Sequence, residues 1–370
     1  MGKKKGKRST AARMTPAQWK KQIERLDREL VKLLNQQAEA AQQLAKASGG
    51  QAASAFPAVG ADEARLQQAE ASNRGPLRNT TVRAVFRELL SGTRCLLHEL
   101  RVCYLGPEFS YSHLAAVQRF GTSAELVPVA TISSVFDSLN RGQADFGLVP
   151  IENSTDGRVT DTLDMFARLP VKIGGEVQLR IHHHLLGKCR RAEVREVYSK
   201  PQALSQCRAF LAQHLPQARP VEMASTAAAA RLAAEKPGAA AIASRQAGVN
   251  YGLDFIAENI EDNRNNITRF AVIGGEPPKR SGNDKTSLMF ELPHEPGALA
   301  DATAVFKRNQ LNLTWIESFP MPQTPNEYLF FIEFQGHPNE TRTQQALKAL
   351  EKKTVRLEVL GCYPAAPALD

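Results

Sequence analysis

Polar side chains follow a short apolar stretch in the middle of this 370-residue chain. The run FGLVPI (146–151) ends directly in a carboxylate, an amide and a hydroxyl, at Glu152, Asn153 and Ser154. A continuous apolar run of this length is typical of a strand buried on both faces. In an open α/β sheet, ligands bind outside the carboxyl ends of the strands. The alternative is a capped turn, in which Asn153 or Ser154 accepts hydrogen bonds from helix amides.

Three further stretches carry side chains that can hold oxygen atoms or relay protons. The stretch ENIEDNRNNITRF (258–270) places Thr268 and Arg269 directly before an apolar strand. The other two are YLGPEFSYSHLAA (104–116) and YSKPQALSQC (198–207). Hydroxyl and amide groups can bind oxygens, and arginine can hold a carboxylate through two parallel hydrogen bonds.

In this order, the four stretches closely resemble the motifs of the prephenate dehydratase family, and the likeness covers Arg101 to Ile273. Four spaced motifs are far more specific than any one of them. The resemblance implies a carbon–oxygen lyase of L-phenylalanine biosynthesis that dehydrates and decarboxylates prephenate to phenylpyruvate without a cofactor. Arogenate, the aminated analogue, remains an alternative substrate.

The family's pattern also implies roles for individual residues. Thr268 corresponds to the residue beside the leaving hydroxyl, where it would hydrogen-bond and relay a proton, with Glu152 or His113 as alternative proton sources. Arg269 is either a carboxylate fork or part of a salt bridge between lobes. The expected catalytic set is Thr268, Asn153, Gln206, Ser199 and Glu152, and the expected substrate contacts are Ser154, Ser225, Thr226, Arg269 and Ser110.

The elements around these motifs alternate between strands and helices. From Arg101 to Ile151 the predicted order is βαβαβ, which is typical of a doubly wound sheet. A second lobe is expected to begin near Val177, with a helix over 202–215 and a strand over 239–243. The resemblance implies a two-lobed α/β domain over 101–276, of the periplasmic-binding-protein type, with the ligand in the cleft between lobes.

An all-α domain is predicted before it, over residues 15–100, after a basic, disordered tail at 1–14. An apolar stripe from Trp19 to Leu44 predicts one long helix that ends before Gly49. A loop over 49–60, a short helix over 62–71 and a long helix from about Thr80 follow. The segments IERLDREL (23–30) and FRELLSGTR (86–94) resemble the chorismate mutase domain that many prephenate dehydratases carry here.

A chorismate mutase needs cationic side chains to bind its dianionic substrate. When the chain is aligned with the family on the IERLD segment, few cationic side chains fall at the family's substrate-binding positions. The polar and cationic positions of the family fall on Lys20, Gln37, Ser48, Asp62 and Leu97, and only Glu63 and arguably Lys20 match the pattern. A buried dicarboxylate without compensation costs several kcal/mol per ion. The sequence therefore predicts a mutase-like fold with weak or absent mutase activity; the alternative is a fully bifunctional enzyme.

A polar linker over 277–285 precedes a βαββαβ pattern over 286–363, which resembles the α+β ACT domain that senses phenylalanine. Phe319 replaces the arginine of the family's ESRP segment, which leaves the sign of regulation open. A homodimer or homotetramer is expected by resemblance. The alternatives are a structural dimerisation domain and, for the whole chain, a non-catalytic amino-acid sensor. The expected phenylalanine-binding residues are Gly297, Ala298, Leu299, Glu317 and Ser318.

Composition restricts the remaining classes of function. Six of the 47 basic residues lie in the first 13 positions, which leaves 41 basic against 38 acidic residues and a nearly neutral body despite a net charge of +9. This distribution argues against nucleic acid as a partner. No apolar run is long enough for a membrane span, and no secretory signal is evident, so we expect a cytoplasmic protein. The five cysteines lack CxxC spacing, which argues against a zinc site or a disulfide framework. The side chains of His182–His184 would alternate between the faces of a strand and could not converge on one metal ion.

Overall fold

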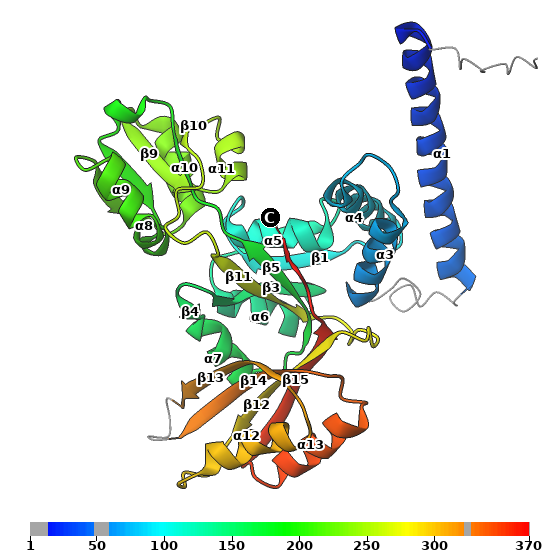
Figure 1. Ribbon diagram of the computed structural model, residues 1–370, viewed down its shortest axis with the longest axis vertical. Helices are drawn as coiled ribbons and strands as arrows, with labels where there is room; N and C mark the ends of the chain where they lie inside the picture. Colours follow the sequence, from blue (N-terminus) through cyan, green and yellow to red (C-terminus); the bar gives the residue numbers. More distant parts are fainter. Residues whose placement is uncertain (1–13, 48–58, 322–326, 370) are drawn as a thin grey trace, which may run out of the picture. The chain divides into compact units, whose positions relative to one another are not determined.

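A computed structural model of the chain describes residues 14–47, 59–321 and 327–369 (Figure 1). Side chains are described from residue 62 onward in the second range. The basic tail and nearly all of the loop predicted at 49–60 lie outside these residues. The chain divides into two compact units, Met1–Phe56 and Pro57–Asp370, and each is considered by itself.

The first unit contains the long helix predicted from the apolar stripe, α1 (Pro16–Ala47). Thr15 caps its start, since its hydroxyl accepts from the Gln18 amide at 3.3 Å and Gln18 Oε1 accepts from the Thr15 amide at 2.7 Å. This reciprocal pair is a capping box, which satisfies two amide groups that the helix itself leaves free.

The second unit begins with two packed helices, α3 (Val59–Ser72) and α4 (Asn79–Cys95). Buried ion pairs join them: Arg83 contacts Glu63 at 2.5 Å, and Arg94 contacts Asp62. Glu88 on α4 accepts from the Thr122 amide at 2.9 Å, which fastens the helix pair to the α/β domain.

The first lobe of the α/β domain is a seven-stranded sheet with the order β16-β5-β11-β3-β1-β2, and β4 pairs with β3. β1 is parallel to β2 and β3, but β11 is antiparallel to β3 and β5, so the predicted doubly wound sheet is mixed. Apolar clusters cover both faces, with α5 on one and α6 and α7 on the other. The elements are β1 (Arg101–Leu105), α5 (Tyr111–Phe120), β2 (Glu125–Val129), α6 (Ile132–Asn140), β3 (Phe146–Asn153), β4 (Gly157–Arg158), α7 (Thr160–Arg168), β5 (Ile173–Arg180), β11 (Ile267–Gly274) and β16 (Ala368–Leu369).

The second lobe begins later than predicted. β5 pairs with β11 along its length and belongs to the first sheet, so the crossing to the second lobe lies after Arg180 rather than near Val177. The helix expected over 202–215 is divided at Cys207 into two. The sheet order is β10-β6-β9-β7-β8. Its elements are β6 (His184–Gly187), η1 (Arg191–Glu193), β7 (Glu196–Ser199), α8 (Pro201–Gln206), α9 (Arg208–His214), β8 (Arg219–Glu222), α10 (Thr226–Glu235), β9 (Ala239–Ala243), α11 (Arg245–Asn250) and β10 (Asp254–Ala257).

The carboxyl-terminal domain has the predicted βαββαβ order, and its antiparallel sheet has the order β13-β14-β12-β15. Helices α12 and α13 cover one face through the cluster that includes Phe306 and Leu350. The other face packs on the α/β domain, because Phe319 and Phe331 belong to the same apolar cluster as Phe136. The elements are β12 (Asp284–Glu291), α12 (Ala298–Arg308), β13 (Leu313–Pro320), β14 (Tyr328–Gln335), α13 (Thr341–Glu351) and β15 (Arg356–Pro364).

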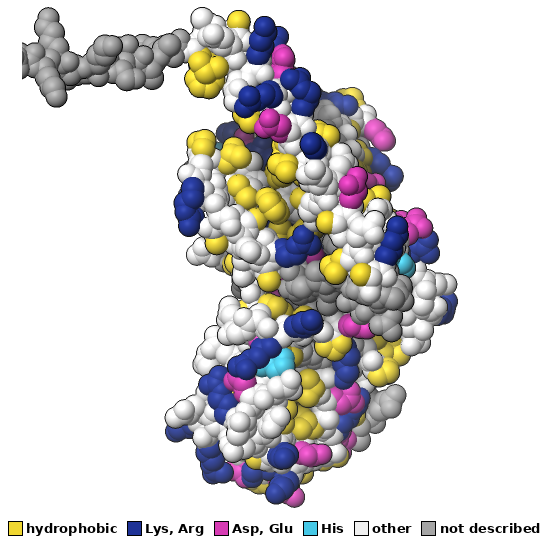
Figure 2. Space-filling view, turned by 90° about the vertical axis from the view of Figure 1, so that its right-hand side faces the viewer, with side chains coloured by type: hydrophobic (Ala, Val, Ile, Leu, Met, Phe, Trp, Pro, Cys, Tyr) yellow, Lys and Arg dark blue, Asp and Glu magenta, His cyan; other side chains and the backbone are white. Residues whose placement is uncertain are grey.

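The surface and the helices bear on two possibilities that composition argued against, a nucleic-acid partner and a membrane span. Figure 2 shows Lys and Arg side chains interspersed with Asp and Glu on the face in view, rather than one basic surface. Within the described residues, every helix is too short or too polar to cross a membrane.

Candidate functional site

The predicted residues Asn153 and Thr268 lie side by side at the ends of two paired strands. In the antiparallel β3–β11 pair, Thr268 is opposite Asn153 and Arg269 is opposite Glu152. Asn153 Nδ2 donates to Thr268 Oγ1 at 2.8 Å. Because successive side chains on a strand point to opposite faces, Asn153 and Thr268 share one face of the sheet and Glu152 and Arg269 share the other.

The orientation of the Asn153 amide is fixed by the turn that follows it. Its Oδ1 accepts from the backbone amides of Thr155 at 2.9 Å and Asp156 at 3.1 Å. Nδ2 therefore faces Thr268 and also Asn266 Oδ1, at 2.9 Å. Since Thr268 Oγ1 accepts from Asn153, its own proton remains available for another group.

Gln206 of α8 connects the second lobe to Asn153 and Thr268 through hydrogen bonds. Its Nε2 donates to Asp156 Oδ2 at 2.8 Å, and its Oε1 accepts from Asn266 Nδ2 at 2.9 Å. His183 Nε2 lies 2.9 Å from the same Oε1. Three predicted residues, Thr268, Asn153 and Gln206, thus belong to one hydrogen-bonded network.

Sequence reasoning missed three members of that network: Asn266, Asp156 and His183. Asn266 lies two residues before Thr268 in a stretch already singled out, so its position was a usable signal. His183 was considered only as a metal ligand. Its neighbours contact other groups, since His182 Nδ1 lies 2.9 Å from Glu261 and His184 Nδ1 accepts from the Asn259 amide. No cluster suited to a metal ion occurs among the described His, Cys, Asp and Glu residues.

Four of the predicted serines have hydrogen bonds that serve the local backbone instead. Ser110 and Ser225 begin α5 and α10, where each accepts from a helix amide. The fully buried Ser199 donates to the Ile242 carbonyl at 2.6 Å, and Ser154 donates to the Asn265 carbonyl at 3.1 Å. Thr226 is a buried residue in the first turn of α10. The structure does not bring these five residues into the Asn153–Thr268–Gln206 network.

Arg269 is held by carboxylates on the opposite face of the sheet. Its guanidinium donates to Glu152 at 2.8 Å, Glu176 at 3.1 Å and Glu333 at 2.5 Å, and Lys285 contacts Glu176 at 2.9 Å. We call these five residues the Arg269 cluster. The structure supports the salt-bridge alternative, but Glu333 and Lys285 come from the carboxyl-terminal domain rather than the second lobe.

Opposite charges in the Arg269 cluster stabilise the charged forms of Arg269 and Glu176. Burial opposes the charge of Arg269, but Glu333 and Glu176 outweigh this effect and raise its pKa. Burial likewise opposes ionisation of Glu176, but Lys285 and Arg269 hold its pKa below the usual value. Arg269 and Glu176 therefore each favour the charged form of the other.

The two alternative proton sources are poorly suited to that role. Glu152 lies on the face opposite Thr268 and is bound by Arg269, so the structure does not place its carboxylate beside the Thr268 hydroxyl. His113 Nδ1 accepts from the Phe109 amide at 3.2 Å, and burial lowers the pKa of its ring. A neutral imidazole whose acceptor is already occupied is a weak acid at neutral pH.

The residues predicted to bind phenylalanine do not all face one side of the carboxyl-terminal sheet. Gly297 precedes α12 with a left-handed backbone (φ 86°), and Ser318 is exposed. Glu317 alternates with Ser318 along β13 and accepts from Arg158 of the α/β domain at 3.1 Å. Phe319, which replaces the expected arginine, is buried against the α/β domain. Glu317 therefore faces the α/β domain, whereas Ser318 lies on the other face of the sheet.

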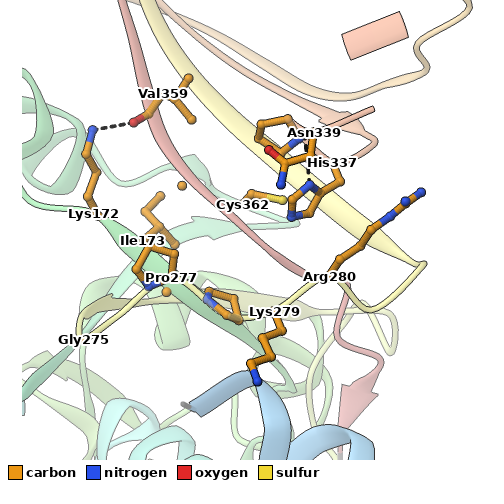
Figure 3. Close-up of a pocket in the computed structure, with 14 residues that line it drawn as sticks. Lys172, Ile173, Gly275, Pro277, Lys279, Arg280, His337, Asn339, Val359 and Cys362 are labelled. Atoms are coloured by element: carbon orange, nitrogen blue, oxygen red, sulfur yellow. Dashed lines mark hydrogen bonds between the residues drawn. The ribbon is translucent and has the colours of Figure 1, made fainter. Parts of the chain in front are cut away.

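Two cavities of the second unit lie outside the hydrogen-bonded network. One of about 650 Å³ lies where the linker passes the carboxyl-terminal domain, and Figure 3 shows Lys172, Pro277 and Cys362 around it. Another, of about 450 Å³, is lined by Tyr111 and His182 among others. None of the residues predicted from the motifs for catalysis lines either cavity. The predicted catalytic residues that lie together are those of the hydrogen-bonded network.

Comparison with known proteins shows which families the chain is similar to. The family model described as "Prephenate dehydratase" matches residues 102–278, "Chorismate mutase type II" matches 19–97 and "ACT domain" matches 286–352. The chain is 40% identical to the "Bifunctional chorismate mutase/prephenate dehydratase" of Aquifex aeolicus, covering 94% of this chain and 97% of that protein.

Two solved structures are similar to most of the second unit. The prephenate dehydratase of Arthrobacter aurescens, described in complex with L-Phe, has a TM-score of 0.67 and 32% identity and covers 72% of this chain and 90% of that one. A protein described as a quorum quenching acylase has a TM-score of 0.65 and 28% identity, covering 72% of this chain and 98% of that one.

Proposed function

Because the chain belongs to the prephenate dehydratase family, in the form that joins chorismate mutase and ACT domains to the dehydratase, we propose that it converts prephenate to phenylpyruvate. In this reaction the bond to the ring carboxylate breaks and releases carbon dioxide. The electron pair enters the ring, which becomes aromatic, and the ring hydroxyl leaves. One proton must be supplied so that hydroxide departs as water.

The Thr268 hydroxyl can relay this proton, since it can donate its own proton to the departing oxygen and regain one from solvent. The Asn153 amide donates to Thr268 Oγ1, which turns the Thr268 proton toward a third group. In the proposed mechanism this group is the leaving hydroxyl. Aromatisation provides most of the driving force, so a well-oriented hydrogen bond suffices where a strong acid would otherwise be needed.

The orientation of the Asn153–Thr268 pair is the observation that carries this proposal. We expect the purified protein to form phenylpyruvate from prephenate. Arogenate, assayed in parallel for phenylalanine formation, decides between the keto and amino substrates. A fold can carry more than one chemistry, as the similar acylase illustrates. A folded protein without turnover on either substrate would support the sensor alternative instead.

A second activity, chorismate mutase, is favoured by the match to residues 19–97 and by the bifunctional relatives. The sequence-based prediction of weak activity still stands beside it. In the second unit Glu63, the retained acidic residue, is paired with Arg83 at 2.5 Å. Burial lowers the pKa of the nearby Arg94 to about 10, a value that still leaves its guanidinium charged at neutral pH.

Chorismate consumption by the full chain tests this second activity. We expect a rate well below that of the dehydratase step, because few cations occupy the family's substrate positions. The assay uses a Thr268→Val chain, in which any prephenate formed from chorismate should accumulate and can be measured directly. A mutase rate that equals or exceeds the wild-type dehydratase rate, and that Glu63→Gln abolishes, would contradict the prediction and support the bifunctional alternative.

We further propose that phenylalanine binds the carboxyl-terminal domain and regulates the dehydratase, as the L-Phe complex of the similar dehydratase suggests. Gly297 is placed for a ligand to approach the first amides of α12, since a Cβ there would meet no protein atom. Pairing of these domains between subunits would make a homodimer or homotetramer, which light scattering can measure. Fractionation of cells can test the expected cytoplasmic location.

Gly297→Ala should weaken phenylalanine binding at least about tenfold, because a methyl group obstructs the helix amides. Calorimetric titration of the full chain with phenylalanine measures the effect. Gly142→Ala is the matched control, since Gly142 also has a left-handed backbone (φ 66°) and open space around its Cα. Equal weakening in both variants would indicate backbone strain and not a ligand contact.

A further inference from the structure

One buried titratable side chain of the hydrogen-bonded network has no role in the mechanism above. His183 is 2% exposed and lies between β5 and β6, on one of the segments that cross between the lobes. Its Nε2 is 2.9 Å from Gln206 Oε1, and its Nδ1 is 3.1 Å from the Tyr111 hydroxyl. The ring therefore connects α5 of the first lobe to α8 of the second.

The surrounding hydrogen bonds decide which ring nitrogen carries the proton. Gln206 Nε2 donates to a carboxylate oxygen of Asp156, so Gln206 Oε1 is the end that faces His183. An amide oxygen can only accept, and it already accepts from Asn266. His183 must then donate through Nε2–H, and this assignment follows from the network rather than from observed hydrogens.

The other side of the ring faces Tyr111, whose hydroxyl donates its one proton to the His182 carbonyl at 2.7 Å and lies 3.1 Å from His183 Nδ1. The assignment of the Nε2 proton therefore rests on Gln206, and the neutral imidazole on burial. Burial lowers the pKa of His183, which favours this neutral form. The His183 backbone amide donates to Glu261 at 2.9 Å, so the main chain of the crossing segment is held in place as well.

We propose that His183 is a positioning residue for the dehydratase reaction, which holds Gln206 through its Nε2–H donor. The proposal rests on the proposed function. With Oε1 held by His183, the Gln206 amide keeps its contact with Asn266, and Asn266 in turn accepts from Asn153, the residue that orients Thr268. A donor at the crossing segment thus holds the Gln206 end of the network, whereas the turn amides and Asp156 set the orientation of the Asn153 and Gln206 amides.

The test exploits the different reach of two amide side chains. Glutamine at position 183 can place an N–H near the former Nε2, whereas asparagine reaches only the position of Nδ1. We expect His183→Asn to lower kcat about ten- to a hundredfold with a smaller change in KM, since it leaves Gln206 Oε1 without its donor. His183→Gln should recover most of the wild-type kcat.

A double-mutant cycle separates positioning from a general structural effect. If His183 acts through Gln206, then His183→Asn should cost little more in a Gln206→Ala chain. The matched control is His184, a neighbouring buried histidine whose Nδ1 accepts from the Asn259 amide. His184→Gln and His184→Asn should not reproduce the difference, and circular dichroism checks that every variant is folded.

Equal activity of His183→Gln and His183→Asn in an active enzyme, or full additivity with Gln206→Ala, would overturn this inference alone. Absence of turnover in the wild-type protein would overturn the proposed function, and the inference with it. A fold defect is recognised by a lower melting temperature in both His183 variants, and an equal loss of kcat in both would count against the role.

Discussion

Replacing Thr268 by valine should lower kcat for phenylpyruvate formation at least about a hundredfold. Valine keeps the branched shape but removes the hydroxyl that would help the leaving group depart. It also leaves the Asn153 amide, which donates to Thr268 Oγ1 at 2.8 Å, without that acceptor. Initial rates with prephenate, followed by phenylpyruvate absorbance, measure the effect.

Thr268→Ser is the matched control, because it retains the hydroxyl while removing only a methyl group. We expect it to keep kcat within about tenfold of the wild-type value. If valine and serine lose activity equally, packing of the methyl group matters and the hydroxyl does not. If neither variant loses activity, the proton must come from another residue, and the proposed role of Thr268 fails.

The second large effect is expected at Arg269, whose replacement by methionine should strongly destabilise the second unit. Glu176 and Glu333 have side chains only 3% and 1% exposed, and Lys285 would be the one remaining cation of the Arg269 cluster. Removing one partner of a buried ion pair typically costs about 3–5 kcal/mol. Thermal unfolding of the full chain measures the change as a lower apparent melting temperature.

Two variants control for this prediction. Arg168→Met removes the partner of Asp164 in an exposed pair at 2.9 Å and should change the melting temperature little. Glu333→Gln removes one of three carboxylates in a cluster with two cations, so it should destabilise less than Arg269→Met. The reverse order would show that the carboxylates, rather than the arginine, limit the stability of the contact between the domains.

The cost of Arg269→Met should also depend on pH. In the wild-type protein the pKa of Glu176 lies below its usual value of 4.5, with Lys285 and Arg269 outweighing burial. A depressed pKa contributes stability that is fully present above 4.5 and is lost as pH falls through the folded value. The difference between the wild-type protein and the variant should therefore be largest near neutral pH and shrink below pH 4.5.

Arg269 also lies beside Thr268 on β11, so the Arg269 cluster links this strand to the carboxyl-terminal domain. Contacts of this kind can transmit an effector's preference for one domain arrangement to the active strand. Phe319, buried at the same contact, replaces a charged side chain by an apolar one. The altered position of the predicted ligand segment therefore lies at the contact between the two domains.

The sequence alone determined the order of the domains and the strand that carries Thr268. Local patterns carried this information: the apolar run before Glu152, the helical stripe of α1 and the βαββαβ order are each set within a few neighbouring residues. Asn153, Gln206 and Thr268 were predicted from the family resemblance of the short motifs in which they lie. The mixed direction of the first sheet and the late start of the second lobe were missed, because strand pairing is a long-range property.

Only the tertiary structure decided which neighbours in sequence act together. Glu152 and Asn153 are adjacent, but strand alternation sends one to the carboxyl-terminal domain and the other to Thr268. His183 gained its contact with Gln206 from the crossing of the two lobes, which no local pattern encodes. The sequence determines the chemistry of each side chain. The hydrogen-bond and ion-pair partners of that side chain depend on pairing between strands and lobes that are far apart along the chain.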